Sequence, residues 1–317
     1  MRTTLFAGAL VVAAAVTLAA QSSSPSSSRV PRTPDGRPDL QGTWDFAQLT
    51  PLERPGTLAD RPVVSDEEAE DLAQQRLETS NKDRRDGGAA ADVERAYNDF
   101  WWDFGTRVTK QSSLVVDPPD GRIPALTPAA QERIAARRGK YENPEERPLA
   151  ERCIVGLNSG PPMVPGVYNN NVEIVQTRDH VVIVNEMIHS ARVVDLRRRA
   201  HHPAAMRFLA GDSIARWDDD TLVVDTANFA KEGVFRGATP AMHLTERFTR
   251  VDAGTLRYEF TVEDPATWTK PWSASIPMVL AKQPMYEYAC HEANYGLEGV
   301  LKGARYQEKQ QTTQKQR

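Results

Sequence analysis

From about Tyr168 onward, apolar residues alternate with polar ones in short runs that turn residues separate. Alternation with period two is typical of β-strands, and breaks of a few turn residues are typical of hairpins. The runs pair at 172–195, 213–226, 243–262 and 273–290, with earlier strands expected at 39–46 and 113–117. The pattern predicts roughly ten strands in an antiparallel meander, and closure into a barrel would remove exposed edges.

The hairpin from Val172 to Asp195 is the most informative of these pairs. After the turn at 178–180, its second arm is predicted as one strand with two largely apolar faces, interrupted by Glu186, His189 and Arg192. Charged groups rarely stay buried unless they are paired or face a polar cavity. Period-two counting places Glu186 and Arg192 on one face and His189 on the other. The three residues are therefore candidates for ligand contact, and the alternative is a buried ion pair that fixes strand register.

The N-terminal half carries helical signals instead. Ser65 with Glu68 three residues later predicts a capped helix start, and Thr127 with Pro128 predicts another helix that ends near Gly139. A further helical segment is expected over 92–104. We expect these helices to form an insertion at about 51–140 within a single β-barrel domain over 39–305.

The two ends of the chain differ in composition from the predicted barrel domain. Residues 1–20 carry Arg2 and a short apolar run, which predicts a secretory signal peptide, and residues 21–38 are a Ser/Pro-rich linker expected to be disordered. The Gln/Lys-rich tail at 306–317 is also expected to be disordered. We therefore expect an exported protein, periplasmic or extracellular, with no membrane span in the mature chain.

Export changes the interpretation of the two cysteines, Cys153 and Cys290. In an oxidising compartment an isolated pair of cysteines forms a disulfide more often than any other structure. The alternative, a reactive thiol or a metal ligand, needs a partner motif that neither cysteine has. The sequence therefore predicts a Cys153–Cys290 disulfide.

Composition and missing motifs narrow the function classes. The formal net charge of −4, with both signs interspersed, gives no electrostatic case for nucleic-acid binding. The sequence has no phosphate-binding glycine loop, dinucleotide fingerprint or nucleophile elbow, so no cofactor is expected. His201 and His202 are adjacent, and the acidic turn at 218–220 is too short for a calcium loop, so no metal site is predicted.

Two resemblances accompany these patterns. Gly42-Thr43-Trp44 resembles the Gly-x-Trp opening of lipocalin-type barrels, which implies a lipocalin-like fold. Four longer stretches lie at 113–124, 185–189, 263–272 and 286–292. Together they resemble an uncharacterised family of exported bacterial proteins, which implies secretion and a single domain but no activity.

Further candidates lie outside the central hairpin. Glu287 and His291 share a face of the predicted last strand, against the alternative of a polar outer face. Arg236 lies on a Gly-flanked loop that could border a barrel mouth. Trp268 and Trp272 could stack on a ligand or pack in the core. His243, Glu246 and Arg247 form a charged group whose alternative is a solvated surface.

The function predicted from these residues is binding of a small amphipathic or apolar ligand in the barrel. One alternative is a cofactor-independent acid–base enzyme (a hydrolase, isomerase or cyclase) that uses Glu186, Glu287 and His291. A second alternative is an envelope interaction or glycan-binding protein with exposed aromatic residues. The predicted ligand contacts are Glu186, His189, Arg192, Arg236, Glu246, Trp268, Trp272, Glu287 and His291.

Overall fold

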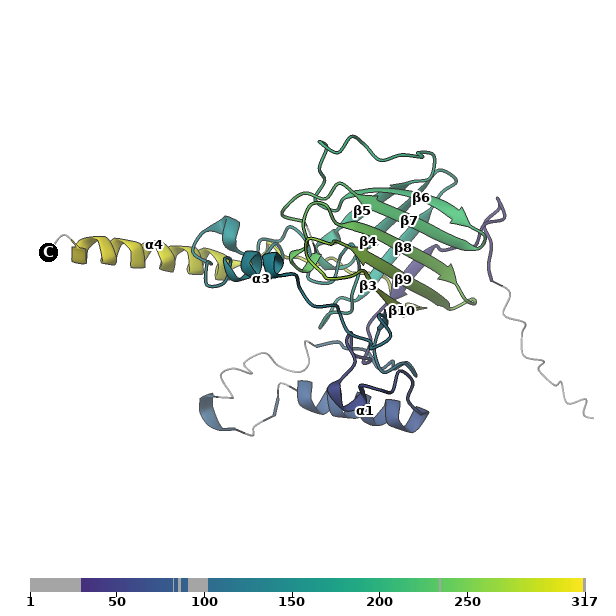
Figure 1. The fold of residues 1–317 in the computed structure, drawn as a ribbon, viewed down its shortest axis with the longest axis horizontal. Helices are drawn as coiled ribbons and strands as arrows, with labels where there is room; N and C mark the ends of the chain where they lie inside the picture. Colours follow the sequence, from purple (N-terminus) through teal and green to yellow (C-terminus); the bar gives the residue numbers. More distant parts are fainter. Residues whose placement is uncertain (1–29, 82, 85–86, 91–101, 234, 316–317) are drawn as a thin grey trace, which may run out of the picture.

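The fold is a closed β-barrel (Figure 1). The computed structural model describes residues 30–81, 83–84, 87–90, 102–233 and 235–315. Within these residues the strands form one sheet in the order β1-β3-β4-β5-β6-β7-β8-β9-β10-β2, and β1 also pairs with β10. That pairing closes a barrel of nine strands, and the short strand β2 pairs with the other end of the β10 edge that β1 uses. The predicted mainly β fold with a closed meander is confirmed.

The strands have the following bounds. They are β1 (Gly42–Asp45), β2 (Val115–Asp117), β3 (Asn171–Gln176), β4 (His180–Asn185), β5 (Ala191–Asp195), β6 (Asp212–Asp218), β7 (Thr221–Ala227), β8 (His243–Arg250), β9 (Thr255–Glu263) and β10 (Trp272–Leu280). All neighbouring pairs are antiparallel except β5 and β6, which meet in parallel at Asp195 and Ile214. The barrel closes where Trp44 of β1 lies opposite Leu280 of β10.

Large aromatic side chains fill the barrel interior. Burial alternates along β8, β9 and β10, so every second side chain points inward. Phe248, Tyr258, Phe260 and Trp272 form a continuous row, with ring centroids 5.0, 5.8 and 5.4 Å apart from one to the next. Each of these side chains is at most 1% exposed. The lumen is therefore a packed core at this level, not the open pocket that the sequence suggested.

The helices of the insertion follow their predicted signals. Helix α1 (Asp66–Ser80) begins at the Ser65–Glu68 capping box, where the Glu68 N–H donates to Ser65 Oγ at 3.2 Å. Helix α3 (Pro128–Ala135) begins after Thr127 and ends four residues before Gly139. Short 3-10 turns, η1 (Gly56–Leu58) and η3 (Pro144–Glu146), lie on either side of α1 and α3. Most of the helix predicted over 92–104, namely 92–101, lies outside the described residues.

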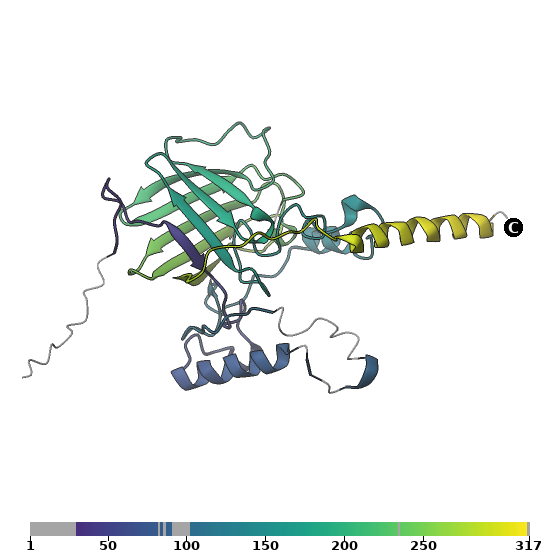
Figure 2. The same ribbon diagram turned by 180° about the vertical axis from the view of Figure 1, so that it is seen from behind.

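The C-terminal region differs from the prediction. The strand predicted at 285–290 is wrong: these residues are irregular, and none of them is buried. Closure of the barrel explains this, because β10 already pairs with β9, β1 and β2 and offers no free edge. Helix α4 (Tyr295–Lys315) then leads away from the barrel (Figure 2), so the described part of the predicted disordered tail is helical. Its Glu, Lys, Gln and Arg residues favour helix, and Arg305 pairs with Glu308 at 2.7 Å.

The N-terminal region is described only in part. The predicted signal peptide at 1–20 lies outside the described residues, as does most of the predicted linker. The described segment before β1, residues 30–41, lies at one end of the barrel, and within it Arg32 and Pro38 form an isolated β-bridge. Among the described helices, none combines the length and the apolar character that crossing a membrane requires.

Candidate ligand site at the barrel end

A tight turn interrupts the segment that the sequence predicts as one strand over 181–195. Strand β4 ends at Asn185, residues Met187–His189 form a 3-10 turn (η4), and β5 returns antiparallel to β4. Ile188 and His189 adopt φ values of 62° and 49°, in the left-handed region that favours glycine. The single-strand prediction is therefore wrong, and so is the face assignment based on it. Arg192 lies opposite Ile183 and points inward.

Two of the predicted residues, Arg192 and Glu246, pair with each other inside the barrel. Arg192 Nη2 donates to Glu246 Oε1 at 2.8 Å, and Nη1 contacts the other carboxylate oxygen. The Tyr258 hydroxyl also donates to Glu246 Oε1 at 2.8 Å. The Arg192 and Glu246 side chains are 8% and 0% exposed. Arg192 therefore lies in a buried ion pair, but its partner is Glu246 and not Glu186, the carboxylate that the sequence placed on the same face.

The contact changes the pKa of Arg192 and of the neighbouring Tyr258. Burial opposes the charge of Arg192, but the Glu246 carboxylate outweighs burial and raises the Arg192 pKa. Burial, together with the Glu246 charge, holds the pKa of Tyr258 well above its usual value. The Tyr258 hydroxyl is therefore neutral, and it also accepts a hydrogen bond from the Met163 N–H at 3.0 Å. Each charged or polar member of this cluster thus has a partner within the barrel.

The remaining predicted residues do not gather around one point. Glu186 is 8% exposed and accepts a hydrogen bond from Asn171 Nδ2 at 2.9 Å, whereas His189, Glu287 and His291 are exposed. Arg236 is exposed on the turn η5 (Phe235–Gly237).

The two predicted tryptophans, Trp268 and Trp272, are 3% and 0% exposed, with ring centroids 5.9 Å apart. Neither of them offers an open ring face to a sugar. Burial on this scale favours core packing, the other interpretation that the sequence allowed.

The histidine and arginine of the third predicted group lie on the outer wall of the barrel. His243 Nε2 is 2.9 Å from Asp225 Oδ2, and Arg247 Nη2 donates to Asp218 Oδ2 at 2.9 Å. The Asp225 hydrogen bond raises the pKa of His243. Glu246 alone of this group faces the interior, as alternation along β8 requires.

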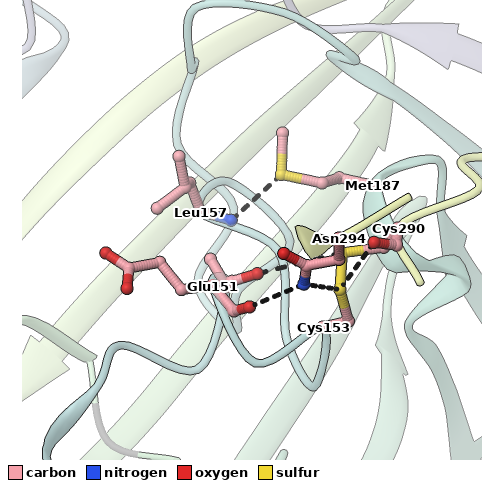
Figure 3. Close-up of a disulfide and its surroundings, with 7 residues drawn as sticks. Glu151, Cys153, Leu157, Met187, Cys290 and Asn294 are labelled. Atoms are coloured by element: carbon pink, nitrogen blue, oxygen red, sulfur yellow. Dashed lines mark hydrogen bonds between the residues drawn. A yellow bond between two sulfur atoms is a disulfide. The ribbon is translucent and has the colours of Figure 1, made fainter. Parts of the chain in front are cut away.

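A cover segment, residues 153–166, closes the barrel end beside η4. Met163 of this segment is 1% exposed and belongs to the hydrophobic core of the barrel. The Ser159 hydroxyl donates to the Met187 carbonyl oxygen at 3.0 Å. The Leu157 N–H donates to Met187 Sδ at 3.1 Å (Figure 3). A Cβ at Gly156 would lie 2.6 Å from Met187 Cγ, so a larger residue there would force these side chains to shift. The cover segment is thus fixed directly against the η4 turn.

The predicted disulfide is present and joins the cover segment to the chain that follows β10 (Figure 3). Cys153 and Cys290 have Cα atoms 5.7 Å apart. Beside them, Asn294 Nδ2 donates to the Glu151 carbonyl oxygen at 3.2 Å. The bond and this hydrogen bond hold the irregular segment 285–294, which forms no strand, at the barrel end.

A groove of about 650 Å³ lies between the η4 turn, the cover segment and residues 288–294. Its apolar surface comes from Met187, Ile188 and Leu157, and the last of these is 64% exposed. Its polar groups include Glu151, Glu292 and Asn294. The groove thus combines apolar contact area with a few polar groups, as small-molecule sites do.

Two tyrosines add a third kind of surface to the groove. Burial raises the pKa of Tyr168, and the neighbouring Tyr288 hydroxyl raises it further. The amide of Asn158, 2% exposed, donates to the carbonyl oxygens of Tyr168 and Asn169 at 3.1 and 2.9 Å and fixes the chain there. The Tyr168 phenol is therefore a positioned neutral hydrogen-bonding group beside an apolar surface.

Two stretches that the sequence singled out, 185–189 and 286–292, meet at this groove. They meet through Met187, Ile188 and Tyr288, not through the predicted Glu186, Glu287 and His291, none of which lines it. The predictions followed charge, whereas the contacts come from apolar and phenolic side chains. Tyr288 lies two residues before Cys290, so the predicted disulfide was the sequence signal that could have identified it.

The chain matches no known family model and no curated protein. In the described residues, no three or more His, Cys, Asp or Glu side chains are arranged to hold a metal ion. Similarity to known proteins therefore assigns no ligand to the groove, and its lining residues are the only guide to what it binds.

Proposed function

We propose that this protein binds a small amphipathic ligand in the groove at the barrel end. The observation that carries the proposal is the groove itself, about 650 Å³ in volume, with an apolar wall at Ile188 and Leu157 and the phenols of Tyr168 and Tyr288. A volume of several hundred Å³ suits a drug-sized molecule. The ligand's apolar part would contact the apolar wall, and its polar end would accept or donate hydrogen bonds at the phenols.

The packed lumen supports a site at the barrel end rather than deep inside. Aromatic rings fill the interior, and the buried Arg192–Glu246 pair has hydrogen-bond partners in each other and in Tyr258. A ligand in the lumen would have to displace these side chains and break their hydrogen bonds. The groove requires no such displacement, because its walls are already fixed by the disulfide and by the Met187 contacts.

The disulfide also supports a location outside the cytoplasm. Structural disulfides persist in oxidising compartments and are rare where glutathione keeps thiols reduced. Together with the signal peptide expected at 1–20, the Cys153–Cys290 bond favours an exported protein that meets its ligand in the periplasm or outside the cell.

A matched pair of variants tests the groove. Leu157 and Val193 are exposed to similar extents, 64% and 61%, but only Leu157 lines the groove, whereas Val193 lies on the outer wall in β5. Binding of the amphipathic probe 1-anilinonaphthalene-8-sulfonate is measured by fluorescence titration. We expect Leu157→Asp to weaken binding by roughly tenfold, since it places a charge against the apolar part of the probe. Val193→Asp should leave the affinity unchanged.

Two further measurements complete the test. Tyr288→Ala should weaken probe binding while the circular dichroism spectrum stays that of the native protein. Native mass spectrometry of protein purified from its own oxidising compartment should reveal a retained small molecule that Leu157→Asp releases. Equal affinities in Leu157→Asp and Val193→Asp would show that the probe binds elsewhere, and the groove proposal would then be wrong.

A further inference from the structure

A second hollow lies at the other end of β4 from the groove. Strand β4 begins after the turn that carries Arg178 and ends at the η4 turn, so the two sites lie at opposite ends of the barrel wall. The second hollow has a volume of about 430 Å³. Its lining residues are Asp35, Arg37, Arg178, Leu196, Arg199, Arg216 and Trp217. We propose that this arginine hollow binds a phosphate-type oxyanion, independently of the ligand groove.

Three separate segments of the chain position Arg37, Arg178 and Arg216. Arg178 lies in the turn between β3 and β4, and Arg216 lies near the end of β6, where alternation directs it outward beside the buried Ala215. Arg37 follows the turn of the N-terminal segment, in which the Thr33 N–H donates to the Arg37 carbonyl oxygen at 2.9 Å. The tertiary fold therefore brings these three arginines together from distant parts of the sequence.

These arginines lack the partners that other arginines in the protein have. Within the described part of the chain, the guanidinium groups of Arg37, Arg178 and Arg216 make no hydrogen bond and no ion pair. By contrast, nearby Arg32 pairs with Asp220, and Arg198 donates to both carboxylate oxygens of Asp212 at 2.8 and 2.9 Å. Donors that converge without an acceptor favour an external anion.

One carboxylate lines the hollow, and it does not neutralise the cluster. Asp35 accepts a hydrogen bond from the Thr33 hydroxyl at 2.5 Å. That bond lowers the Asp35 pKa most, and the charges of Arg37 and Arg178 lower it further. Arg199, the fourth arginine of the lining, donates a hydrogen bond from Nη1 to the Leu196 carbonyl oxygen at 2.7 Å. Four cations therefore face one anion, and a bound oxyanion with more than one negative charge would relieve their repulsion.

The chemistry of guanidinium groups selects the class of ligand. Arginine presents a planar fork of N–H donors that matches the oxygens of phosphate and carboxylate groups, and several forks favour a group with several charged oxygens. The Arg37 guanidinium carbon lies 5.5 Å from the centroid of the Trp217 ring, which restrains Arg37 beside the hollow. The phosphate group could belong to a free phosphorylated compound or to a lipid headgroup, and the experiment separates these sources.

Isothermal titration calorimetry with sodium pyrophosphate tests the free anion. Two variants, Arg178→Gln and Arg216→Gln, each remove one unpaired cation, and Arg257→Gln is the control, because Arg257 is exposed on β9 outside the hollow. Each hollow variant should weaken binding by roughly tenfold, the loss expected for a charge-assisted hydrogen bond. The control should stay within about twofold, and wild-type affinity should fall as salt is raised to about 0.15 M.

Cosedimentation with vesicles tests the lipid source. Vesicles of phosphatidylcholine with phosphatidylglycerol are compared with vesicles of phosphatidylcholine alone. Binding to the anionic vesicles alone, lost in Arg178→Gln and Arg216→Gln, assigns the phosphate to a headgroup, and pyrophosphate binding without vesicle binding assigns it to a free compound. Absence of binding to both probes overturns the proposal. An equal loss in the Arg257→Gln control also overturns it, because binding would then reflect overall charge.

Discussion

Removal of the Glu246 charge is the sharpest test of how the barrel interior is stabilised. Glu246 is fully buried and accepts hydrogen bonds from Arg192 and from the Tyr258 hydroxyl. In Glu246→Gln, one amide oxygen can still accept from Arg192, but the guanidinium loses its counter-charge, and its other contacts, to Ser213 Oγ and Thr226 Oγ1, are long at 3.4 Å. Loss of one partner from a buried pair leaves an uncompensated charge, so the free energy of unfolding should fall by about 3–5 kcal/mol.

Removal of both charges should cost less than removal of one. Replacement of a buried ion pair by apolar residues of similar volume is often neutral or stabilising. In the double variant Arg192→Met with Glu246→Leu, the Tyr258 hydroxyl loses its acceptor and still accepts from the Met163 N–H. An unsatisfied buried donor costs about 1–3 kcal/mol. The double variant should therefore be more stable than Glu246→Gln.

Urea denaturation, followed by tryptophan fluorescence and circular dichroism at neutral pH, measures these differences. The control is Glu259→Gln, since Glu259 pairs with Arg257 at 3.2 Å on the exposed side of β9. A surface pair of this kind contributes less than about 1 kcal/mol. A Glu246→Gln variant within about 1 kcal/mol of the wild type, or a double variant no more stable than the single one, would show that the buried charge does not depend on its partner as stated.

Three further predictions follow from other parts of the molecule. Replacement of both Cys153 and Cys290 by serine should lower the free energy of unfolding by about 5 kcal/mol in the chain-entropy model, because the bond spans 137 residues; an unchanged urea midpoint would contradict this. Asp225 raises the pKa of His243, so this contact stabilises the fold fully below the unfolded value of 6.5 and is lost as pH rises through the higher folded pKa. The stability difference between wild type and His243→Gln, measured in urea, should therefore be larger near about pH 5.5 than near about pH 8.5, and a difference independent of pH would count against it. Ile276→Val, inside the lumen, should cost about 1 kcal/mol yet leave probe affinity for the groove unchanged; a change in affinity would indicate a ligand in the lumen.

Alternation made the barrel predictable where turns carry polar residues or glycine. The hairpin β6–β7 turns at Asp219 and Asp220, and β8–β9 turns at 252–254 with Gly254, so both were placed within a few residues. The β4–β5 turn was missed because it contains neither glycine nor proline. Apolar Met187 and Ile188 continue the hydrophobic run through it, and Ile188 adopts a left-handed conformation that β-branched residues rarely take.

Of the two charged residues in the barrel, only Arg192 was predictable as a buried residue, because it interrupts an apolar strand. Glu246 was predicted only as part of a charged group with a solvated surface as its alternative, and the contact between the two residues was not predicted. Their contact joins β5 to β8, which are separated in the sheet by β6 and β7, so it crosses the interior instead of a strand pair. Local pattern carries no information on such a contact, because it depends on closure of the barrel and on strand register.

The closed barrel also explains why both proposed binding sites lie at its ends. Rings such as Phe260 and Trp272 fill the interior, and a packed interior accepts no ligand without loss of stability. At the ends, strands give way to turns whose side chains are free of the alternation that the sheet imposes. The η4 turn contributes Ile188 to the groove, and the β3–β4 turn contributes Arg178 to the arginine hollow. Because the strands hold these turns at fixed separations, substitutions at either end can change binding while the barrel keeps its stability.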